Sequence, residues 1–246
     1  MAGAPGQLAA LRSVFRNPDR TSGLTCAVCT TPAVGQGYRH CFQCNSHLQT
    51  RLSLANVVAP ITYAVEGSQA MRDLYNYKAQ DGGLTAIAAR DRLFNGLYTS
   101  LSEHLACFEG ITTIATVPSS GGRLGSHPLE QMRSMFDDGF DHAHVEYIGP
   151  PGLDRQQRRV LAPERYEVDS RSLEGARVLL LDDAWVSGVH TQSVAAALKI
   201  SGASHVAAVP IGRVVSPSYS ESREYLAQHP AGPFDPSICP ISGARH

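Results

Sequence analysis

The sequence has no strong excess of charge of either sign, since 21 Lys and Arg stand against 22 Asp and Glu, for a formal net charge of -1. Without a basic excess, a polyanion would have to bind at a local patch. There is also no run of about 18 apolar residues, which excludes an ordinary membrane-spanning helix. Residues 1–20 lack the continuous apolar core and the cleavage site of a signal peptide, so we expect a cytoplasmic protein.

Charged residues make up 17% and apolar residues 43% of the chain, which is the composition of an ordinary globular protein. No internal repeat is evident. A chain of 246 residues is long enough for one sizeable α/β domain, or for such a domain with a small additional module.

Four of the six cysteines form two closely spaced pairs: Cys26, Cys29, Cys41 and Cys44. In a reducing compartment, this spacing indicates a metal site rather than disulfides. Four thiolates can surround Zn²⁺ tetrahedrally and leave no open coordination position, so we predict a structural zinc ion. Unligated thiols or a redox pair remain as alternatives. We expect Cys107 to be a packing residue, and Cys239 has no assigned role.

Aliphatic and β-branched runs predict strands, and helical spacing of apolar residues predicts helices between them. The predicted strands are 56–65, 111–118, 144–148, 166–168, 177–183 and 205–212, and the predicted helices are 68–80, 84–107, 128–136 and 194–199. This alternation favours a parallel sheet with helices on both faces. We divide the chain into an N-terminal segment with the four-cysteine module (1–52), an α/β domain (53–215) and a C-terminal tail (216–246) that we expect to lie irregularly over the surface.

Residues 178–193 read VLLLDDAWVSGVHTQS, in which a buried strand runs into Asp182 and Asp183 and then into a turn at Ser187 and Gly188. In open α/β sheets, ligands bind beyond the carboxyl ends of strands. A turn followed by a helix near Thr191 offers N–H groups to an anion, while the carboxylates can accept hydrogen bonds from hydroxyls. A ribose 5-phosphate has both groups. The alternative is that the acids only cap the next helix.

The same stretch resembles the phosphoribosyl-diphosphate loop of type I phosphoribosyltransferases. The matching positions are Asp182, Asp183, Ser187 and Gly188. Val186 and His190 depart from the pattern, because the family commonly has Thr at both places. Thr191 follows one position later and could substitute. These departures remove hydroxyls but leave the backbone cradle.

The order of motifs is similar to that of one subgroup, the ComF-like and amidophosphoribosyltransferase-like proteins. These have a four-cysteine module, a helix ending in a Tyr-Lys pair (here Tyr77 and Lys78), a strand ending in VPSS, a Gln/Arg-rich loop and the two-acid motif. The resemblance spans about residues 26–212. It implies a parallel sheet flanked by helices, as in type I phosphoribosyltransferases, with a small N-terminal zinc-binding module.

The resemblance further implies Mg²⁺-dependent transfer of a phosphoribosyl group from 5-phosphoribosyl 1-diphosphate to a nitrogen nucleophile, with release of pyrophosphate. Asp182 and Asp183 would be the catalytic residues. The implied ligand-binding residues are Ser187, Gly188, Val189, His190, Thr191, Ser119, Arg123, Lys78 and Arg158.

Within that set, the resemblance implies that the segment 117–123 forms the pyrophosphate loop, with Arg123 and Lys78 facing the diphosphate. The alternatives are an ordinary strand-to-helix turn at 117–123 and a solvated lysine at the end of a helix. Arg155, Arg158 and Arg159 suit a lid that closes over a polyanion, although solvated loop cations are the plain alternative. We expect Trp185 to anchor the loop in the core rather than shape the site.

The alternative function is a non-catalytic binding protein that keeps the fold for sensing or for a ComF-like role in DNA uptake or partner docking. Nucleic acid would be a partner only in that case. A homodimer is left open.

Overall fold

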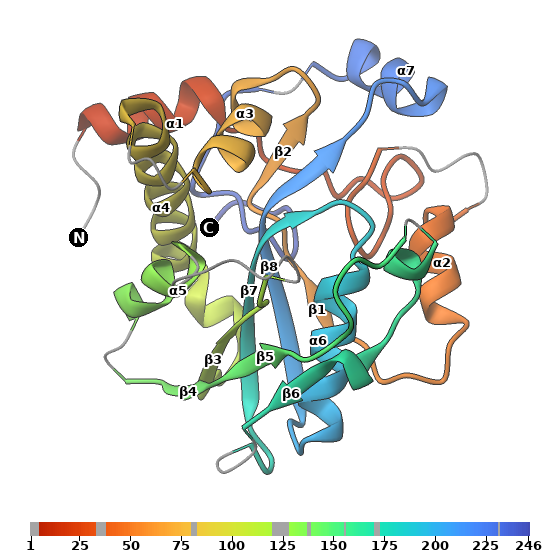
Figure 1. Cartoon of the computed structure of the whole chain (residues 1–246). Coiled ribbons are helices and arrows are strands. Elements are labelled where there is room, and N and C mark those ends of the chain that lie inside the picture. The colour runs from red at the N-terminus through yellow and green to blue at the C-terminus, as the bar shows by residue number, and fades with distance from the viewer. Residues whose placement is uncertain are drawn as a thin grey trace.

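The computed structural model describes residues 5–32, 38–79, 83–119, 128–136, 139–154, 156–169, 173–230 and 232–246. Its centre is a six-stranded sheet whose paired strands are all parallel. The strands are β1 (Val57–Val58), β2 (Thr62–Val65), β3 (Thr113–Thr116), β4 (Asp141–Ala143), β7 (Arg177–Trp185) and β8 (His205–Val215). Their order is β1-β8-β7-β3-β4, and β2 also pairs with β8 (Figure 1). The predicted parallel sheet is therefore confirmed.

The two central strands are the ones with the longest aliphatic runs. Val178, Leu179, Leu180 and Leu181 of β7 are fully buried, and so is Val209 of β8. Strands covered on both faces need apolar residues at successive positions, which is why these two stretches lack the polar alternation of a half-exposed strand.

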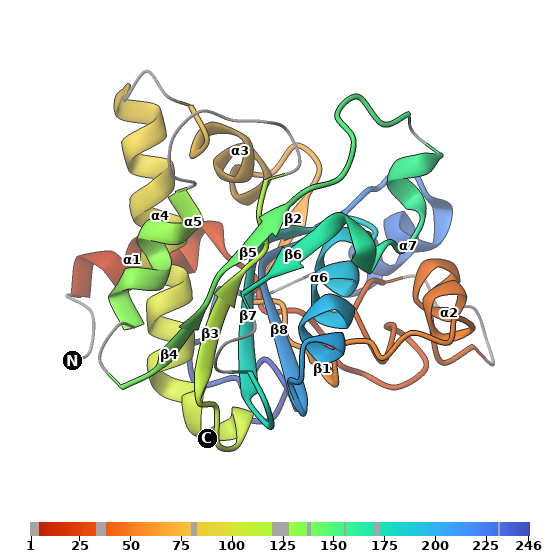
Figure 2. The ribbon, with the colours of Figure 1, turned by 60° about the horizontal axis from the view of Figure 1, so that its bottom comes forward.

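The helices lie on both faces of this sheet. They are α1 (Pro5–Val14), α2 (Phe42–Leu48), α3 (Gln69–Asn76), α4 (Leu84–His104), α5 (Pro128–Arg133), α6 (Val189–Ile200) and α7 (Ser220–Gln228), with 3-10 turns η1 (Leu105–Phe108), η2 (Ser134–Phe136), η3 (Gln157–Arg159) and η4 (Pro163–Arg165). Figure 2 shows α1, α4 and α5 on one face and α6 on the other. Among the described residues, no helix is both long and apolar enough to cross a bilayer.

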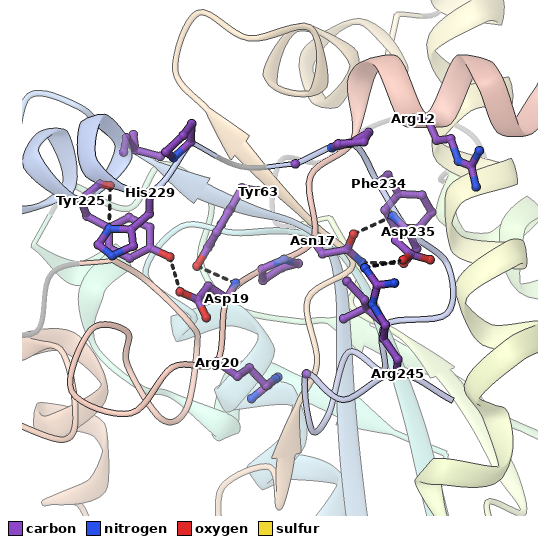
Figure 3. A pocket seen from close by; sticks show the side chains of 17 residues that line it. Arg12, Asn17, Asp19, Arg20, Tyr63, Tyr225, His229, Phe234, Asp235 and Arg245 are labelled. Carbon is purple, nitrogen blue, oxygen red and sulfur yellow. Dashed lines mark hydrogen bonds and ion pairs between the residues drawn. The ribbon is translucent and has the colours of Figure 1, made fainter.

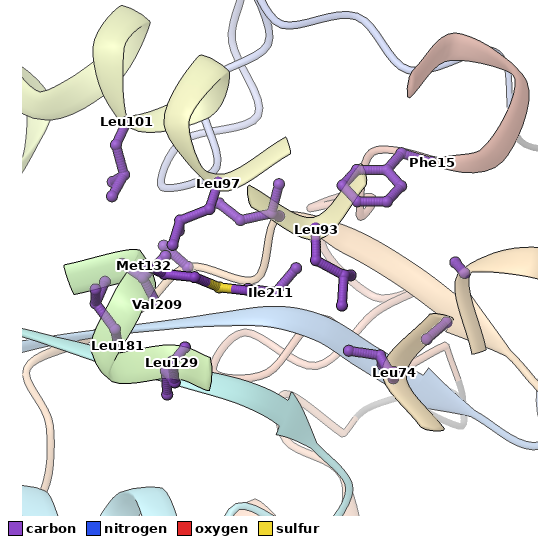
Figure 4. Packing of buried hydrophobic residues seen from close by; sticks show 14 of the residues in the cluster. Phe15, Leu74, Leu93, Leu97, Leu101, Leu129, Met132, Leu181, Val209 and Ile211 are labelled. Atoms are coloured by element: carbon purple, nitrogen blue, oxygen red, sulfur yellow. The ribbon is translucent and has the colours of Figure 1, made fainter. Parts of the chain in front are cut away.

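The larger of the cores lies between α4 and the sheet. Leu93, Leu97 and Leu101 recur every four residues along α4 and are fully buried against residues such as Leu181 and Ile211 of the central strands (Figure 4). This spacing places one apolar stripe of the helix on the sheet. A second core forms between α6 and the opposite face.

Two of the predicted strands do not join the sheet. The segments predicted at 144–148 and 166–168 form β5 (Val145–Tyr147) and β6 (Tyr166–Val168), which pair with each other in an antiparallel ribbon. The predicted strand 56–65 is divided into β1 and β2, because both short strands pair with β8 but at separate places along it.

The C-terminal tail is more ordered than we expected. It contains α7, and beyond that helix Phe234 and Cys239 are both buried. Phe234 packs edge-on against Phe15, with ring centroids 5.7 Å apart. The tail therefore contributes side chains to the core instead of only covering the surface.

Candidate functional site

The carboxyl ends of β7 and β3 lie together at one edge of the sheet. Thr116 pairs with Leu181, and the N–H of Val117 donates to the carbonyl of Leu181 at 2.9 Å. Ser119 therefore follows β3 at the edge where Asp182 follows Leu181. Such an edge is where open α/β sheets bind ligands. Residues 120–127, including Arg123, are outside the described residues, so the expected pyrophosphate loop stays a prediction.

Asp182 is turned into the protein. Its side chain accepts hydrogen bonds from the hydroxyl of Thr191 in the first turn of α6 and from the N–H of Asp183, the latter at 2.8 Å. Burial, followed by the charge of Asp183, raises the pKa of Asp182 to about 8, although both hydrogen bonds favour the ionised form. Asp182 thus fastens the start of α6 to β7 through the hydroxyl of Thr191, whereas an acid that capped the helix would accept from one of its backbone N–H groups.

Asp183 is the more accessible acid and contacts the residues that follow α3. The hydroxyl of Tyr77 donates to its Oδ2 at 2.5 Å, and the ammonium group of Lys78 forms an ion pair with the same oxygen. The Lys78 side chain is 38% exposed and that of Asp183 is 13% exposed. The resemblance implies that Lys78 faces the diphosphate; in this structure Lys78 forms an ion pair with Asp183, the second acid of the motif.

Two arginines of α4 hold α3 in this position. Arg92 makes a bidentate ion pair with the fully buried Asp73, with both N···O distances 2.7 Å. Arg90 donates to the carbonyls of Tyr77 and Ala79 at 2.8 and 2.6 Å. Because these carbonyls lie just past the end of α3, Arg90 fixes the short segment that presents Tyr77 and Lys78 to Asp183.

The turn that opens α6 depends on a glycine. Gly188 has φ +78°, in the left-handed region that favours glycine, and a Cβ built there would lie 2.1 Å from Cζ2 of Trp185. The missing side chain therefore makes room for the indole ring, a requirement that the sequence did not reveal. The first turn of α6 has N–H groups without helical partners, which favours an anion at this place.

Trp185 is 1% exposed and anchors this turn, as predicted. The buried Arg213 of β8 donates to the carbonyls of Trp185 and Val186 at 2.9 and 3.1 Å, which fixes the backbone between strand and turn. Trp185 also belongs to one buried cluster with Cys26, Cys29 and Cys44. The turn and the four-cysteine module therefore share a core.

The cationic loop lies beside the same turn. Arg158 lines a small cavity with Val189 and His190, whereas Arg159 lines a groove of about 640 Å³ with Val186 and Ser187. Both arginines are exposed, and Arg155 is outside the described residues. Two arginines at the amino end of a helix add to the positive potential there.

His190 is held by the β5–β6 ribbon. Its Nδ1 lies 2.7 Å from the hydroxyl of Tyr166 in β6. Burial, and then the charges of Arg158 and Arg165, lower the pKa of His190, which favours the neutral ring. Tyr166, Arg213 and Arg90 are site residues that sequence reasoning missed, because each reaches the site from a distant part of the chain without a local motif.

The four cysteines of the N-terminal module come together as predicted. Their Sγ atoms all lie within 4.8 Å of one another, and those of Cys29 and Cys41 are 3.8 Å apart. Tetrahedral zinc with bonds of about 2.3 Å places its sulfur ligands about 3.8 Å apart, so the cluster fits a structural zinc ion.

Comparisons with known proteins find little overall similarity. No family model matches the chain, and no curated protein matches it. A solved structure of the allosteric regulatory enzyme of purine biosynthesis is similar over 57% of this chain and 30% of its own, with 17% sequence identity and a TM-score of 0.36. The matched part of this chain thus corresponds to less than a third of that enzyme.

Proposed function

We propose that the chain is a phosphoribosyltransferase of the ComF-like kind, which binds 5-phosphoribosyl 1-diphosphate with Mg²⁺ and transfers the phosphoribosyl group to a nitrogen nucleophile. One observation carries the proposal. The partly exposed carboxylate of Asp183 lies near the end of β7 and the left-handed turn at Gly188 follows that strand, so a group able to accept hydrogen bonds from hydroxyls and a helix amino end are neighbours.

The two halves of the motif would hold the two halves of a ribose 5-phosphate. Asp183 would accept hydrogen bonds from the ribose hydroxyls, and Asp182 would support it from behind through the N–H of Asp183. The hydroxyl of Ser187 and the N–H groups of residues 188–191 would hold the 5-phosphate. Thr191 would contribute its N–H, because its hydroxyl already donates to Asp182.

In the reaction, the bond between ribose C1 and the diphosphate oxygen would break while a bond from C1 to the nitrogen forms; the bonding electrons would leave with the diphosphate, and the nitrogen would lose a proton to water. Mg²⁺ bound to the diphosphate would neutralise its charge as it leaves. Lys78, Arg123 and Arg158 are the cations we assign to the same group. When the ligand binds, Lys78 would leave its ion pair with Asp183 and pair with the diphosphate instead. The carboxylate of Asp183 would then be able to bind the ribose hydroxyls. Closure of the loop around η3 would exclude water.

The four cysteines would hold Zn²⁺ for a structural purpose. A closed set of four thiolates leaves no position for substrate, so the ion would crosslink the module. The burial of Trp185 against three of the cysteines suggests that this crosslink supports the turn of the proposed phosphate site.

Calorimetry tests the proposal. Asp183→Asn should weaken binding of 5-phosphoribosyl 1-diphosphate with Mg²⁺ by about 10-fold or more, the loss of a hydrogen bond to a charged group, while sulfate binding changes by less than about 2-fold. The matched control is Asp141→Asn, an exposed acid at the opposite edge of the sheet. Equal affinity of Asp183→Asn and the wild type would reject the assignment. Pyrophosphate release with a panel of nitrogen bases would then identify the acceptor.

A second candidate is a protein that binds the same ligand without transferring it. The exposed Val186 favours it, because this position offers no hydroxyl to the phosphate, and so does the occupation of Asp183 by Tyr77 and Lys78. Its site would then serve sensing, DNA uptake or partner docking. Tight binding with no pyrophosphate release for any base would support this candidate over the first.

A further inference from the structure

A second group of metal-ligating side chains lies far from the four-cysteine module. His104 and Cys107 come from the end of α4 and from η1, and Cys239 and His246 come from the C-terminal segment. One ligand atom of each lies within 4.8 Å of every other. Cys107 Sγ and His246 Nε2 are 3.9 Å apart. Ligands of a tetrahedral zinc ion lie about 3.3 to 3.8 Å apart, given bonds of about 2.0 to 2.3 Å, so a small inward movement would complete the shell.

His104 has the burial and the hydrogen bonding that are typical of a metal ligand. It is 1% exposed, and its Nε2 donates to the carbonyl of Pro236 at 2.7 Å. A ring that donates from Nε2 carries its lone pair on Nδ1, and this buried atom has no hydrogen-bond partner among the described residues. Histidines that bind metals usually donate their other N–H to a carbonyl or carboxylate, which fixes the tautomer and the ring. An unpaired buried nitrogen is costly without such a ligand.

Each pair of ligands is also positioned by regular backbone. His104 and Cys107 are three residues apart, which places them on one side of a helical turn. Cys239 and His246 lie on the two arms of a tight loop. The N–H of Cys239 donates to Ala244 at 2.8 Å, that of His246 donates to Ser237 at 3.0 Å, and Ile238 bridges to Arg245. A helical turn and a paired loop thus each present two ligands.

We propose that this cluster is a second zinc site, a Cys₂His₂ centre that fastens the C-terminal segment to the end of α4. Two thiolates and two imidazoles form a closed set that suits a structural zinc ion. The proposal is independent of the proposed enzymatic function.

Other contacts of the same segment indicate what the ion would secure. Asn17 exchanges two hydrogen bonds with the backbone of Asp235, and Arg20 donates to the carbonyl of Pro240 at 2.7 Å. Figure 3 shows Asn17, Asp235 and Arg245 at one side of a pocket of about 510 Å³ between the two ends of the chain. Both full views show the C-terminus beside the lower part of α4. The metal would therefore hold the segment that joins α4 to residues 17–20.

Metal analysis of the full chain tests the site. After brief chelation of every sample, we expect about two zinc ions per wild-type chain. The variants Cys239→Ser, His246→Ala and Cys26→Ser/Cys44→Ser should each retain about one. Arg245→Ala is the matched control, because it changes the exposed neighbour of His246, and it should keep both ions. His246→Ala removes an exposed side chain, so its result does not depend on repacking of the core.

Co²⁺ substitution provides a second measurement. The thiolate-to-metal absorption should fall in His246→Ala and Cys239→Ser and persist in Arg245→Ala. One zinc ion per wild-type chain, or two ions that both persist in the Cys239→Ser and His246→Ala variants, would overturn the proposal. An intact mass lower by two hydrogens, from a bond between Cys107 and Cys239, would overturn it as well.

Discussion

The indole ring of Trp185 fills the space that a side chain at Gly188 would need, so strand β7 and the turn that follows it are packed against each other through a glycine. A Cβ at position 188 would lie 2.1 Å from Cζ2 of the ring. Trp185 is buried with Cys26, Cys29 and Cys44. A displacement of the indole ring would therefore also disturb the packing of the cysteine cluster.

Gly188→Ala should lower the free energy of unfolding by about 2 to 4 kcal/mol, from the left-handed backbone and from the overpacked ring together. Sulfate affinity should fall with it, because the turn must shift. Gly67→Ala is the control, since Gly67 has φ +85° and nothing within 4 Å of the added Cβ, so it should cost only about 1 kcal/mol. Denaturant unfolding measures both, and equal losses would show that the ring tolerates the methyl group.

Removal of metal from the four-cysteine cluster should be visible in fluorescence. Trp185 is the only tryptophan of the sequence and packs with three of the cysteines. Chelation should therefore loosen its surroundings and shift its emission to longer wavelength. The Cys26→Ser/Cys44→Ser variant should show the shifted spectrum before any chelator is added. An emission maximum that does not respond to metal removal would contradict the coupling.

Arg92→Ala should be strongly destabilising, by about 3 to 5 kcal/mol, because it leaves the fully buried Asp73 without its charge partner. Arg72→Ala is the control on α3, where the arginine is exposed and bonds to Gln69 and a backbone carbonyl; it should cost less than about 1 kcal/mol. Thermal and denaturant unfolding measure the difference. A loss below about 1 kcal/mol for Arg92→Ala would show that Asp73 finds another partner.

The free energy of unfolding should fall as pH rises from about 4 to about 8, through the contribution of Asp182. Its pKa is about 8 in the folded protein against an ordinary value of 3.8, so the folded state holds more protons between these values. Asp183, Thr191 and Lys78 face this carboxyl, but burial dominates. The slope should flatten in Asp182→Asn.

The comparison of wild type with Asp182→Asn is necessary because His190 acts in the opposite direction. Its pKa is lowered by burial, so it contributes stability that is lost as pH falls. Urea unfolding at half-unit pH intervals measures both slopes. Parallel curves for the two proteins would mean that Asp182 is ionised in the folded state throughout.

The central sheet could be predicted from sequence because most of its strands are marked by a local run of aliphatic or β-branched residues. Leu179 and Leu180 lie in a continuous aliphatic run that only a doubly covered strand requires. The β5–β6 ribbon could be predicted as strands but not as a separate sheet, since the paired residues lie about 20 positions apart and no short hairpin turn fixes their register. The helix α7 and the buried Phe234 follow a Ser- and Pro-rich stretch of weak periodicity, so nothing local indicated them.

The candidate site divides in the same way. Asp182, Asp183 and Gly188 lie within one short stretch of the sequence, so a local motif was enough to predict them as site residues. The roles of Arg213 and Tyr166 depend on contacts with residues 24 to 28 positions away. The cluster of His104, Cys107, Cys239 and His246 is harder still, because Cys107 and His246 are 139 positions apart. Only the fold brings such ligands together, whereas the two CxxC pairs can be recognised from their spacing in the sequence.

Strand β8 pairs on one side with β7 and on the other with β1 and β2, which precede it by most of the chain: Asn56 receives the N–H of Val206 from 150 positions away. During synthesis, the backbone groups of β1 and β2 that pair with β8 therefore stay unpaired until β8 has been made. Contacts of this separation slow folding and leave apolar edges exposed in the meantime. Cys26, Cys29 and Cys44 are synthesised before β8, but they share their final core with Ala208 of that strand. Their module can thus reach its final packing only after β8 has been synthesised.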